Sequence, residues 1–206
     1  MTRCLRKLRC FWLLVPVLVT ACSTTQVKAV WKDPSYLEHP NRIMVVSVTR
    51  SPLKRRIFED EFVRQLRARG TDAVASYTVL PDSKDGDQAR IAKTVKEQGA
   101  DAVLITRLVS KKTVKVHVPG TVYYPPRHYG KWRDYYSQGY QAVYMPGYVA
   151  EDEYAIMETN LYDARNDTLV WAATSETEVD GSDQNRIKSY IGIMVNTMIE
   201  QNVLSR

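Results

Sequence analysis

The run Ile43-Met44-Val45-Val46-Ser47-Val48 sets the fold class of this chain. It contains no charged residue, and in an extended backbone its apolar side chains point to both faces. Such a run is typical of a strand that is covered on both faces by other parts of the protein. We therefore expect a central strand over 43–48 and an α/β fold around it.

The segment that follows has the boundaries of a helix. Ser51 suits the N-cap, Pro52 suits the first helical position, and Gly70 supplies the C-terminal stop. The expected buried stripe consists of apolar residues spaced by four: Phe58, Phe62 and Leu66. We therefore predict that a helix lies between Ser51 and Gly70 and buries this stripe.

Charged residues cover the other faces of this expected helix. Asp60 and Arg64 could form an exposed i,i+4 ion pair. The basic residues around these faces are Lys54, Arg55, Arg56, Arg64, Arg67 and Arg69. A solvated helix face explains them more simply than a site for an anionic ligand, although both interpretations stay open.

Further strands and a second helix follow in alternation. We predict a strand over 73–80, a helix over 87–98 with Ile91 and Val95 directed inward, and a strand over 102–109. This β-α-β-α-β order implies parallel strands joined by right-handed crossovers. The last strand should continue with one face in water, because valines alternate with polar residues: Val114, Val116 and Val118 with Thr113, Lys115 and His117.

The C-terminal part of the chain predicts a hairpin and a helix. Residues 154–162 and 168–179 should pair, with Leu169 and Trp171 pointing into the core from one face. The helix should begin after Ser182 and bury one apolar stripe: Ile187, Ile191, Met194 and Met198. The predicted fold class is thus α/β (α+β), a single domain over 41–206 with one mixed sheet and helices packed on it.

The first 21 residues have the pattern of an export signal. A basic start precedes the apolar run 11–21, which is shorter than the ~20 residues needed to span a bilayer. The sequence 18–22, Leu-Val-Thr-Ala-Cys, resembles the lipobox of bacterial lipoproteins. This resemblance implies cleavage before Cys22, a diacylglycerol on its sulfur and a further acyl chain on its amine. An ordinary secretory signal with an incidental cysteine is the alternative.

Cleavage would change the composition of the chain. Cys4 and Cys10 would leave with the signal, so the mature protein would hold Cys22 alone and no disulfide, thiol nucleophile or cysteine-bound metal. The signal carries 4 of the 29 basic residues and none of the 23 acidic ones, which leaves 25 against 23, a net charge of about +2. This balance argues against nucleic acid as a partner.

The residues after the expected cleavage site indicate a location. By resemblance to enterobacterial sorting, Ser23 in place of an aspartate implies the outer membrane, and we expect the periplasmic face. Residues 22–40 should form a lipidated tether and an edge strand, the strand covering 26–31.

A tyrosine-rich insert, 121–150, interrupts the predicted domain. It holds eight of the thirteen tyrosines: Tyr123, Tyr124, Tyr129, Tyr135, Tyr136, Tyr140, Tyr144 and Tyr148. Proline and glycine break any regular period, and tyrosine offers a large contact area at low entropic cost. We predict a surface that contacts protein or glycan. The alternative is a loop folded over the sheet edge with its rings as local core.

Catalytic motifs are not evident in the sequence. His39, His117 and His128 are scattered, which gives no metal-ligand spacing, and no phosphate-binding or nucleotide-binding glycine motif is present. The acidic runs 59–61 and 151–153 could hold a paired-carboxylate hydrolase site, but a helix face and a strand entrance explain them more simply. We expect a protein that is not an enzyme and has no metal or cofactor.

Five short motifs resemble a family of bacterial lipoproteins that has no established activity. They are Trp31-Lys32-Asp33-Pro34, Arg56-Ile57-Phe58-Glu59-Asp60, Ala75-Ser76-Tyr77-Thr78-Val79-Leu80-Pro81, Gly99-Ala100-Asp101-Ala102-Val103-Leu104 and Glu158-Thr159-Asn160-Leu161-Tyr162-Asp163. More distantly, the element order resembles the α/β core of the TolB amino-terminal domain, the peptidoglycan-synthase activator LpoB and the curli secretion subunit CsgG. Likeness of fold does not transfer function, but it favours partner binding over catalysis.

Three functions follow from these observations. The first is a lipid-anchored envelope protein that binds a protein or peptidoglycan partner through the insert. The second is a CsgG-like, self-assembling secretion or pore subunit, which requires two ~10-residue strands with lipid-facing alternation. Proline and glycine in the insert speak against such strands. The third, a cell-wall hydrolase, would use Glu151, Asp152 and Glu153.

Overall fold

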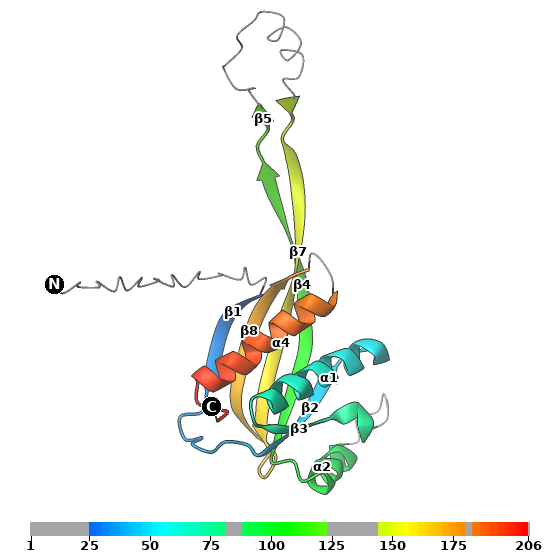
Figure 1. Cartoon of the computed structure of the whole chain (residues 1–206), viewed down its shortest axis with the longest axis vertical. Helices are drawn as coiled ribbons and strands as arrows, with labels where there is room; N and C mark the ends of the chain where they lie inside the picture. Colours follow the sequence, from blue (N-terminus) through cyan, green and yellow to red (C-terminus); the bar gives the residue numbers. More distant parts are fainter. Residues whose placement is uncertain (1–24, 81–87, 123–143, 180–182, 206) are drawn as a thin grey trace, which may run out of the picture.

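A computed structural model describes residues 25–80, 88–122, 144–179 and 183–205 of the 206-residue chain. These residues form one mixed sheet in the strand order β1-β8-β7-β4-β2-β3 and a small second sheet, β5-β6 (Figure 1). The strands of the main sheet are β1 (Thr25–Lys32), β2 (Arg42–Val48), β3 (Asp72–Ala75), β4 (Ala102–Val118), β7 (Tyr148–Asp163) and β8 (Thr168–Glu178). The predicted single α/β domain is confirmed.

Helices cover both faces of this sheet. They are α1 (Pro52–Ala68), α2 (Gln88–Glu97) and α4 (Asp183–Glu200), with a short 3-10 helix η1 (Ser76–Thr78). On β2, Ile43 and Val45 pack in the core beneath α1 and α4, whereas Met44 packs with Val95 of α2. The strand over 43–48 is therefore covered on both faces, and it lies between β4 and β3 in parallel to both, as predicted.

Helix α1 begins and ends where its sequence predicts. The Ser51 side chain accepts a hydrogen bond from the Lys54 backbone N–H at 3.3 Å, and Gly70 has a positive φ of 87° after the last turn. Phe62 and Leu66 are fully buried, and Phe58 packs partly against the same core.

The ion pair predicted between Asp60 and Arg64 was wrong. Arg64 pairs with Glu61 one turn away, and Asp60 accepts a hydrogen bond from the Tyr77 hydroxyl at 2.8 Å. Residues at i,i+3 also lie side by side on a helix, so Glu61 competes with Asp60 for the same guanidinium.

Two elements near the edge of the sheet differ from their predictions. The strand predicted over 73–80 ends at Ala75 in β3, because the chain turns into η1 where Ser76 and Tyr77 donate hydrogen bonds to Glu59. In α2, Val95 is buried as expected but Ile91 is exposed. The second half of this helix makes the contact with the sheet, through Thr94 and Val95, so the inward position predicted for Ile91 was wrong.

The C-terminal hairpin pairs as predicted, with one irregularity. Leu161 lies opposite Trp171, whereas Tyr162 lies opposite Leu169, so Val170 is an extra residue in β8. Because this bulge shifts the register by one residue, Leu169 and Trp171 point to opposite faces. Trp171 is fully buried, but Leu169 is only half-buried, which corrects the prediction that they share a face.

The termini of the domain pack on the antiparallel half of the sheet. Strand β1 pairs with β8 and forms one edge of the sheet, which confirms the edge strand predicted over 26–31. Helix α4 buries Ile191, Met194 and Met198 against the sheet, as its stripe predicted, and Ile187 packs partly against the same core.

Candidate functional site

Strands β4 and β7 extend far beyond the rest of the sheet. They pair with each other from Ala102↔Asp163 to Val118↔Tyr148. Strand β2 flanks β4 only as far as Arg107, and β8 flanks β7 only from Tyr154 onward. The remaining parts of the two strands project from one end of the domain, together with β5 (Thr121–Val122) and β6 (Tyr144–Met145) (Figure 1). We call residues 108–122 and 144–153 the ribbon.

The half of the ribbon nearer the domain is charged. Its β4 side carries Lys111, Lys112 and Lys115, and its β7 side carries Glu151, Asp152 and Glu153. Lys115 Nζ lies 3.1 Å from Glu151 Oε1, and Lys111 Nζ lies 3.4 Å from Glu153 Oε2. These ion pairs join the strands on one face, although exposed pairs of this kind stabilise a protein by less than ~1 kcal/mol each.

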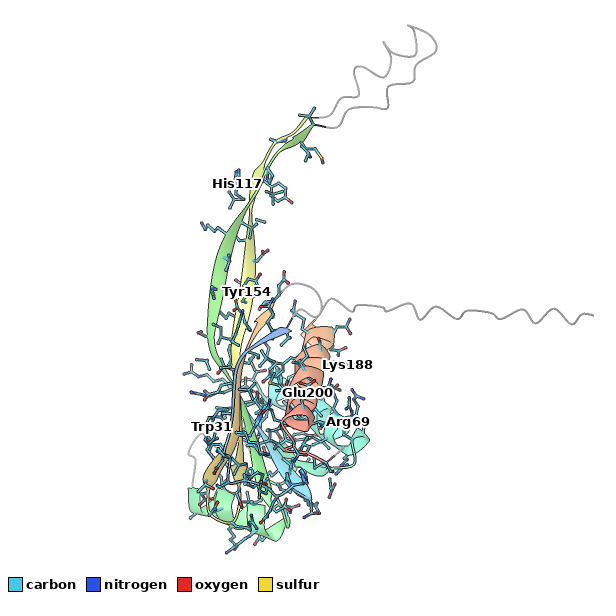
Figure 2. All side chains as sticks on the ribbon, turned by 90° about the vertical axis from the view of Figure 1, so that its left-hand side faces the viewer. Trp31, Arg69, His117, Tyr154, Lys188 and Glu200 are labelled. Carbon is cyan, nitrogen blue, oxygen red and sulfur yellow. The ribbon has the colours of Figure 1, made fainter. Side chains whose placement is uncertain are left out.

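The outer half of the ribbon carries no charged residue. Residues 116–122 and 144–150 contain no Asp, Glu, Lys or Arg, and their large apolar side chains stand in solvent. The exposed fractions are 42% for Val116, 63% for Met145, 62% for Tyr148 and 56% for Val149. The sequence predicted one face in water, but both faces are largely exposed because none of the described helices reaches the ribbon (Figure 2). A row of exposed apolar side chains often marks an interaction surface.

Two glycines bring the strands close together where β4 and β7 give way to β5 and β6. A Cβ on Gly120 would lie 2.8 Å from the Gly147 backbone N, and one on Gly147 would lie 2.9 Å from the Gly120 backbone N. Only glycine permits this approach of two backbones. The Pro-Gly pairs at 119–120 and 146–147 therefore mark a point where the two backbones of the ribbon approach closely. The ribbon continues beyond them in β5 and β6.

The predicted tyrosine-rich insert, 121–150, is shorter than expected. Its flanks, 121–122 and 144–150, belong largely to strands of the ribbon, because cross-strand pairing continues past the prolines and glycines. Tyr148 is exposed and Tyr144 lies in β6. The other proposed site residues lie outside the described residues: Cys22, Tyr123, Tyr124, Tyr129, Tyr135, Tyr136 and Tyr140.

The acidic run 59–61 does not form a paired-carboxylate site. Glu59 is fully buried and accepts hydrogen bonds from the Ser47 N–H at 3.0 Å, the Tyr77 N–H at 2.8 Å and the Ser76 hydroxyl at 2.9 Å. Arg55 Nε donates to the same carboxylate at 3.0 Å. Glu59 thus ties α1 to the ends of two parallel strands. The sequence pattern did not predict this role, since the run reads as a solvated helix face.

The neighbouring carboxylates of this run have separate partners. Asp60 accepts from Tyr77, and hydrogen bonds from Arg64 hold the pKa of Glu61 below its usual value. On the ribbon, Glu151 and Glu153 lie on one face beside lysines, and Asp152 lies opposite Val114 on the other face. In neither run do the described side chains bring two carboxylates together for acid–base chemistry.

Basic residues of α1 divide into three kinds. Arg55 is half-buried against Glu59, which departs from the solvated face predicted for it, and Arg56 stacks over the Tyr77 ring at 5.5 Å. Arg64 of α1 and Arg69, which caps its C-terminus, instead line a groove of about 610 Å³ between α1 and α4, together with Lys188. Figure 2 labels Arg69 and Lys188. This groove keeps the alternative of an anionic ligand open.

The two histidines that the structure describes lie apart from each other. His39 Nδ1 lies 3.2 Å from the Val203 carbonyl oxygen, His117 lies far out on the ribbon, and His128 lies outside the described residues. Among the residues that the structure describes, no group of three His, Cys, Asp or Glu side chains is placed to bind a metal. In the same part of the chain, no helix has the length and apolar character needed to cross a bilayer.

The fold and the ribbon together define a class: a single-domain α/β protein that presents an exposed, two-stranded extension. No protein-family model matches the chain, and no curated protein matches it. The resemblance to a lipoprotein family therefore stays a prediction.

Solved structures with similar architecture include three bacterial proteins. PelC from Paraburkholderia phytofirmans, solved as a dodecamer, has a TM-score of 0.46 and 15% identity, with 87% of this chain and 97% of that chain covered. Lipoprotein GNA1162 from Neisseria meningitidis has a TM-score of 0.41 and 16% identity, with 79% of this chain and 97% of that chain covered. The hypothetical protein CT253 from Chlamydia trachomatis has a TM-score of 0.34 and 13% identity, with 79% of this chain and 92% of that chain covered. We infer no function from likeness at this level.

Proposed function

We propose that this chain is a lipid-anchored protein of the bacterial cell envelope that acts as a non-enzymatic binding or scaffolding module. The observation that carries the proposal is the ribbon. It extends from a well-packed domain, and residues 123–143, which contain six of the predicted contact tyrosines, join β5 to β6 in the sequence. The domain serves as the support, and the outer end of the ribbon serves as the contact surface.

The energetics of the ribbon support a binding role. A two-stranded extension buries little apolar surface by itself and is at best marginally stable in water. This one also leaves Val116, Met145 and Tyr148 exposed. A partner that covers these side chains would supply the missing burial, at ~25 cal/mol for each Å² of apolar surface removed from water.

The chemistry of the described residues also favours binding over catalysis. The carboxylates that could have formed a hydrolase site are held by hydrogen bonds or by lysines: Glu59 by four donors, and Glu151 and Glu153 by Lys115 and Lys111. Carboxylate oxygens that are already engaged by donors of the protein are poorly placed to contact a substrate.

Location in the envelope rests on the N-terminal sequence. The basic start, the apolar run and Cys22 in the lipobox position support lipidation, and Ser23 supports the outer membrane. We place the domain on the periplasmic side as part of the proposal. Two or three acyl chains on Cys22 would make the attachment stable.

The role of residues 123–143 in binding a partner is tested by replacing them. Residues 123–143 are replaced by Asn-Gly, which suits a two-residue hairpin turn, and a photo-crosslinker is placed at Met145 in full-length and shortened proteins. We expect crosslinks to a specific protein from the full-length chain, lost on shortening while the circular dichroism of the domain is unchanged. Identical crosslinks from both chains, together with identical co-sedimentation with isolated peptidoglycan, would overturn the proposal. Loss of co-sedimentation with isolated peptidoglycan, without loss of a protein crosslink, would assign the wall as the partner instead.

Self-assembly is a second candidate function, and the charges of the ribbon favour it. Strands β4 and β7 run to Val118 and from Tyr148, and pairing resumes in β5 and β6 beyond the Pro-Gly pairs, so proline and glycine interrupt the ribbon without ending it. The β4 side of the ribbon is basic and the β7 side is acidic, so where two copies lie side by side, lysines that pair with Glu151 and Glu153 within one chain can also face the acidic β7 side of the next. Light scattering of the detergent-extracted protein tests this candidate.

Charge reversal sharpens that test. Changing Lys111, Lys112 and Lys115 to glutamate should abolish assembly, and so should changing Glu151, Asp152 and Glu153 to lysine. The variant that carries both sets of changes should assemble again, because complementarity is restored. A monomeric wild-type protein would remove this candidate.

A further inference from the structure

The ribbon leaves the domain at the same end as the N-terminal strand. Thr25, the first residue of β1, pairs with Thr177, which pairs with Ala155, which in turn pairs with Lys111 of β4. Lys111 is therefore level with the start of β1, and the rest of β4 continues beyond that level. Val116 lies about 17 Å further along the strand and Val118 about 24 Å further, at ~3.4 Å per residue.

The proposed lipid anchor lies very close to this end. If Cys22 carries the lipid, as the proposed function has it, only Ser23 and Thr24 separate it from Thr25. Three residue steps reach about 10 Å at most, even in a fully extended chain. The start of β1 must therefore lie within roughly 10 Å of the bilayer surface.

This short connection limits the direction of the ribbon. The domain continues about 24 Å behind Thr25, along β1 to Lys32, at ~3.4 Å per residue. A ribbon directed away from the bilayer would push that opposite end of the domain into the lipid. The ribbon can therefore only run along the bilayer surface or toward it, and both directions keep its outer half near the lipid headgroups.

The side chains along the ribbon change character where this contact would begin. Charged residues end at the pair Lys115↔Glu151. Residues 116–122 and 144–150 beyond it carry no charge and expose Val116, Tyr148 and Val149. Apolar side chains with tyrosine suit the interface between headgroups and acyl chains, where tyrosine is enriched in membrane proteins.

We propose that the uncharged outer half of the ribbon, 116–122 and 144–150, lies in the interfacial region of the bilayer to which the N-terminal lipid is attached. The hydrocarbon core is excluded for a single copy. Among the described residues no further strand flanks this part of the ribbon, so its outward backbone N–H and C=O groups need water or headgroups as partners. The outer half of the ribbon thereby lies at the membrane plane, and the protein partner of the proposed function is one exposed at that plane.

Site-specific fluorescence tests the proposal on the lipidated full chain. The signal cysteines are removed on export and Cys22 is blocked by lipid, so one introduced cysteine is the only free thiol. An environment-sensitive label is placed at Val116→Cys, at Val149→Cys on the opposite face, or at Lys93→Cys in α2 as the control. The proteins are reconstituted in vesicles of phosphatidylethanolamine and phosphatidylglycerol. Intact mass reports whether Cys22 is lipidated.

We expect the labels at 116 and 149 to shift their emission to the blue, to lose quenching by aqueous iodide and to gain quenching by headgroup-attached nitroxide. The label at 93 should stay open to iodide. If Cys22 carries lipid, iodide quenching at 116 and 149 equal to that at 93 would overturn the contact between the ribbon and the bilayer. The proposed anchor would then still stand. A mass without lipid would overturn the anchor itself, and with it the geometry from which the ribbon's contact is inferred.

Discussion

The hydroxyl of Tyr190 in α4 lies 2.8 Å from Oγ1 of Thr106 in β4. It also bonds Thr159 of β7, the strand beside β4, and its ring packs against Phe58 and Phe62 of α1. Tyr190 is almost fully buried, and burial raises the pKa of its hydroxyl. One side chain thus joins α4, α1 and the two strands from which the ribbon grows.

Removing this hydroxyl should weaken the domain modestly. In Tyr190→Phe the two threonine hydroxyls keep each other, at 3.2 Å, but lose the phenol, so the free energy of unfolding should fall by about 1 kcal/mol. Urea denaturation measures this change. Tyr148→Phe is the matched control, because Tyr148 is exposed on the ribbon, and it should unfold like the wild type. Equal stabilities of all three proteins would contradict the polar contact described here.

Replacing the buried carboxylate of Glu59 should cost more. Glu59→Gln keeps the size of the side chain but removes the negative charge beside Arg55 and turns one acceptor into a donor. Breaking a buried, hydrogen-bonded ion pair in this way should lower the free energy of unfolding by about 3 kcal/mol. Glu97→Gln on the exposed face of α2 should change it by less than about 0.5 kcal/mol. A small effect at both sites would show that Glu59 is not the tie between α1 and the strands.

Asp163 should make stability depend on acid pH. Hydrogen bonds from the Arg165 side chain, and one from its backbone N–H, hold the pKa of Asp163 below the usual value of 3.8. Because the folded-state pKa is lower than the unfolded one, the contribution is complete above about pH 4 and is lost as the pH falls through the folded-state pKa.

The Asp163→Asn variant measures this contribution. Its free energy of unfolding should be lower than wild type at pH 7, and the difference should shrink toward pH 3. Asp167→Asn, in the adjacent turn with φ of 56°, should follow the wild-type profile, since asparagine adopts that conformation readily. Parallel profiles for wild type and Asp163→Asn would contradict the assignment.

Two tryptophans separate core packing from surface exposure. Trp171 is fully buried under α4, whereas Trp31 on β1 is 49% exposed. Trp171→Ala should lower the free energy of unfolding by about 3–5 kcal/mol, since it leaves a large cavity. Trp31→Ala should stay within about 1 kcal/mol of wild type. Urea denaturation of the two variants measures both free energies of unfolding. A larger decrease for Trp31→Ala than for Trp171→Ala would refute the register of β8.

The close approach of the two backbones at Gly120 and Gly147 should depend on these glycines. A methyl group at Gly120 would meet backbone atoms at 2.8 Å, so Gly120→Ala should push the strands apart and speed amide hydrogen exchange in β5 and β6. The melting temperature of the domain should be unchanged, because the ribbon adds little to its core. Gly192→Ala in α4 is the control, since it meets only the Gln65 side chain, at 3.2 Å. Unchanged exchange in Gly120→Ala would rule out the close approach.

Local patterns predicted much of the domain. The apolar run over 43–48, the Ser51-Pro52 start and Gly70 end of α1, and the stripe of α4 each depend on neighbours within a few residues, and each is confirmed. Where a distant residue acts on the segment, the prediction was wrong. Glu59 draws Ser76 and Tyr77 into η1 and thereby shortens β3, and the bulge at Val170 turns Leu169 away from Trp171.

The sequence by itself determined the alternation of β4, the charge-free residues around 116–122 and 144–150, and the lipobox pattern at Cys22. Only the tertiary structure decided that these strands pair with each other, because Lys115 and Glu151 stand far apart in the chain and their register is set by the whole of β4 and β7. It also decided that none of the described helices covers the ribbon. Periodicity tells which side chains share a face, but only the packing of distant elements tells whether that face is buried or left for a partner.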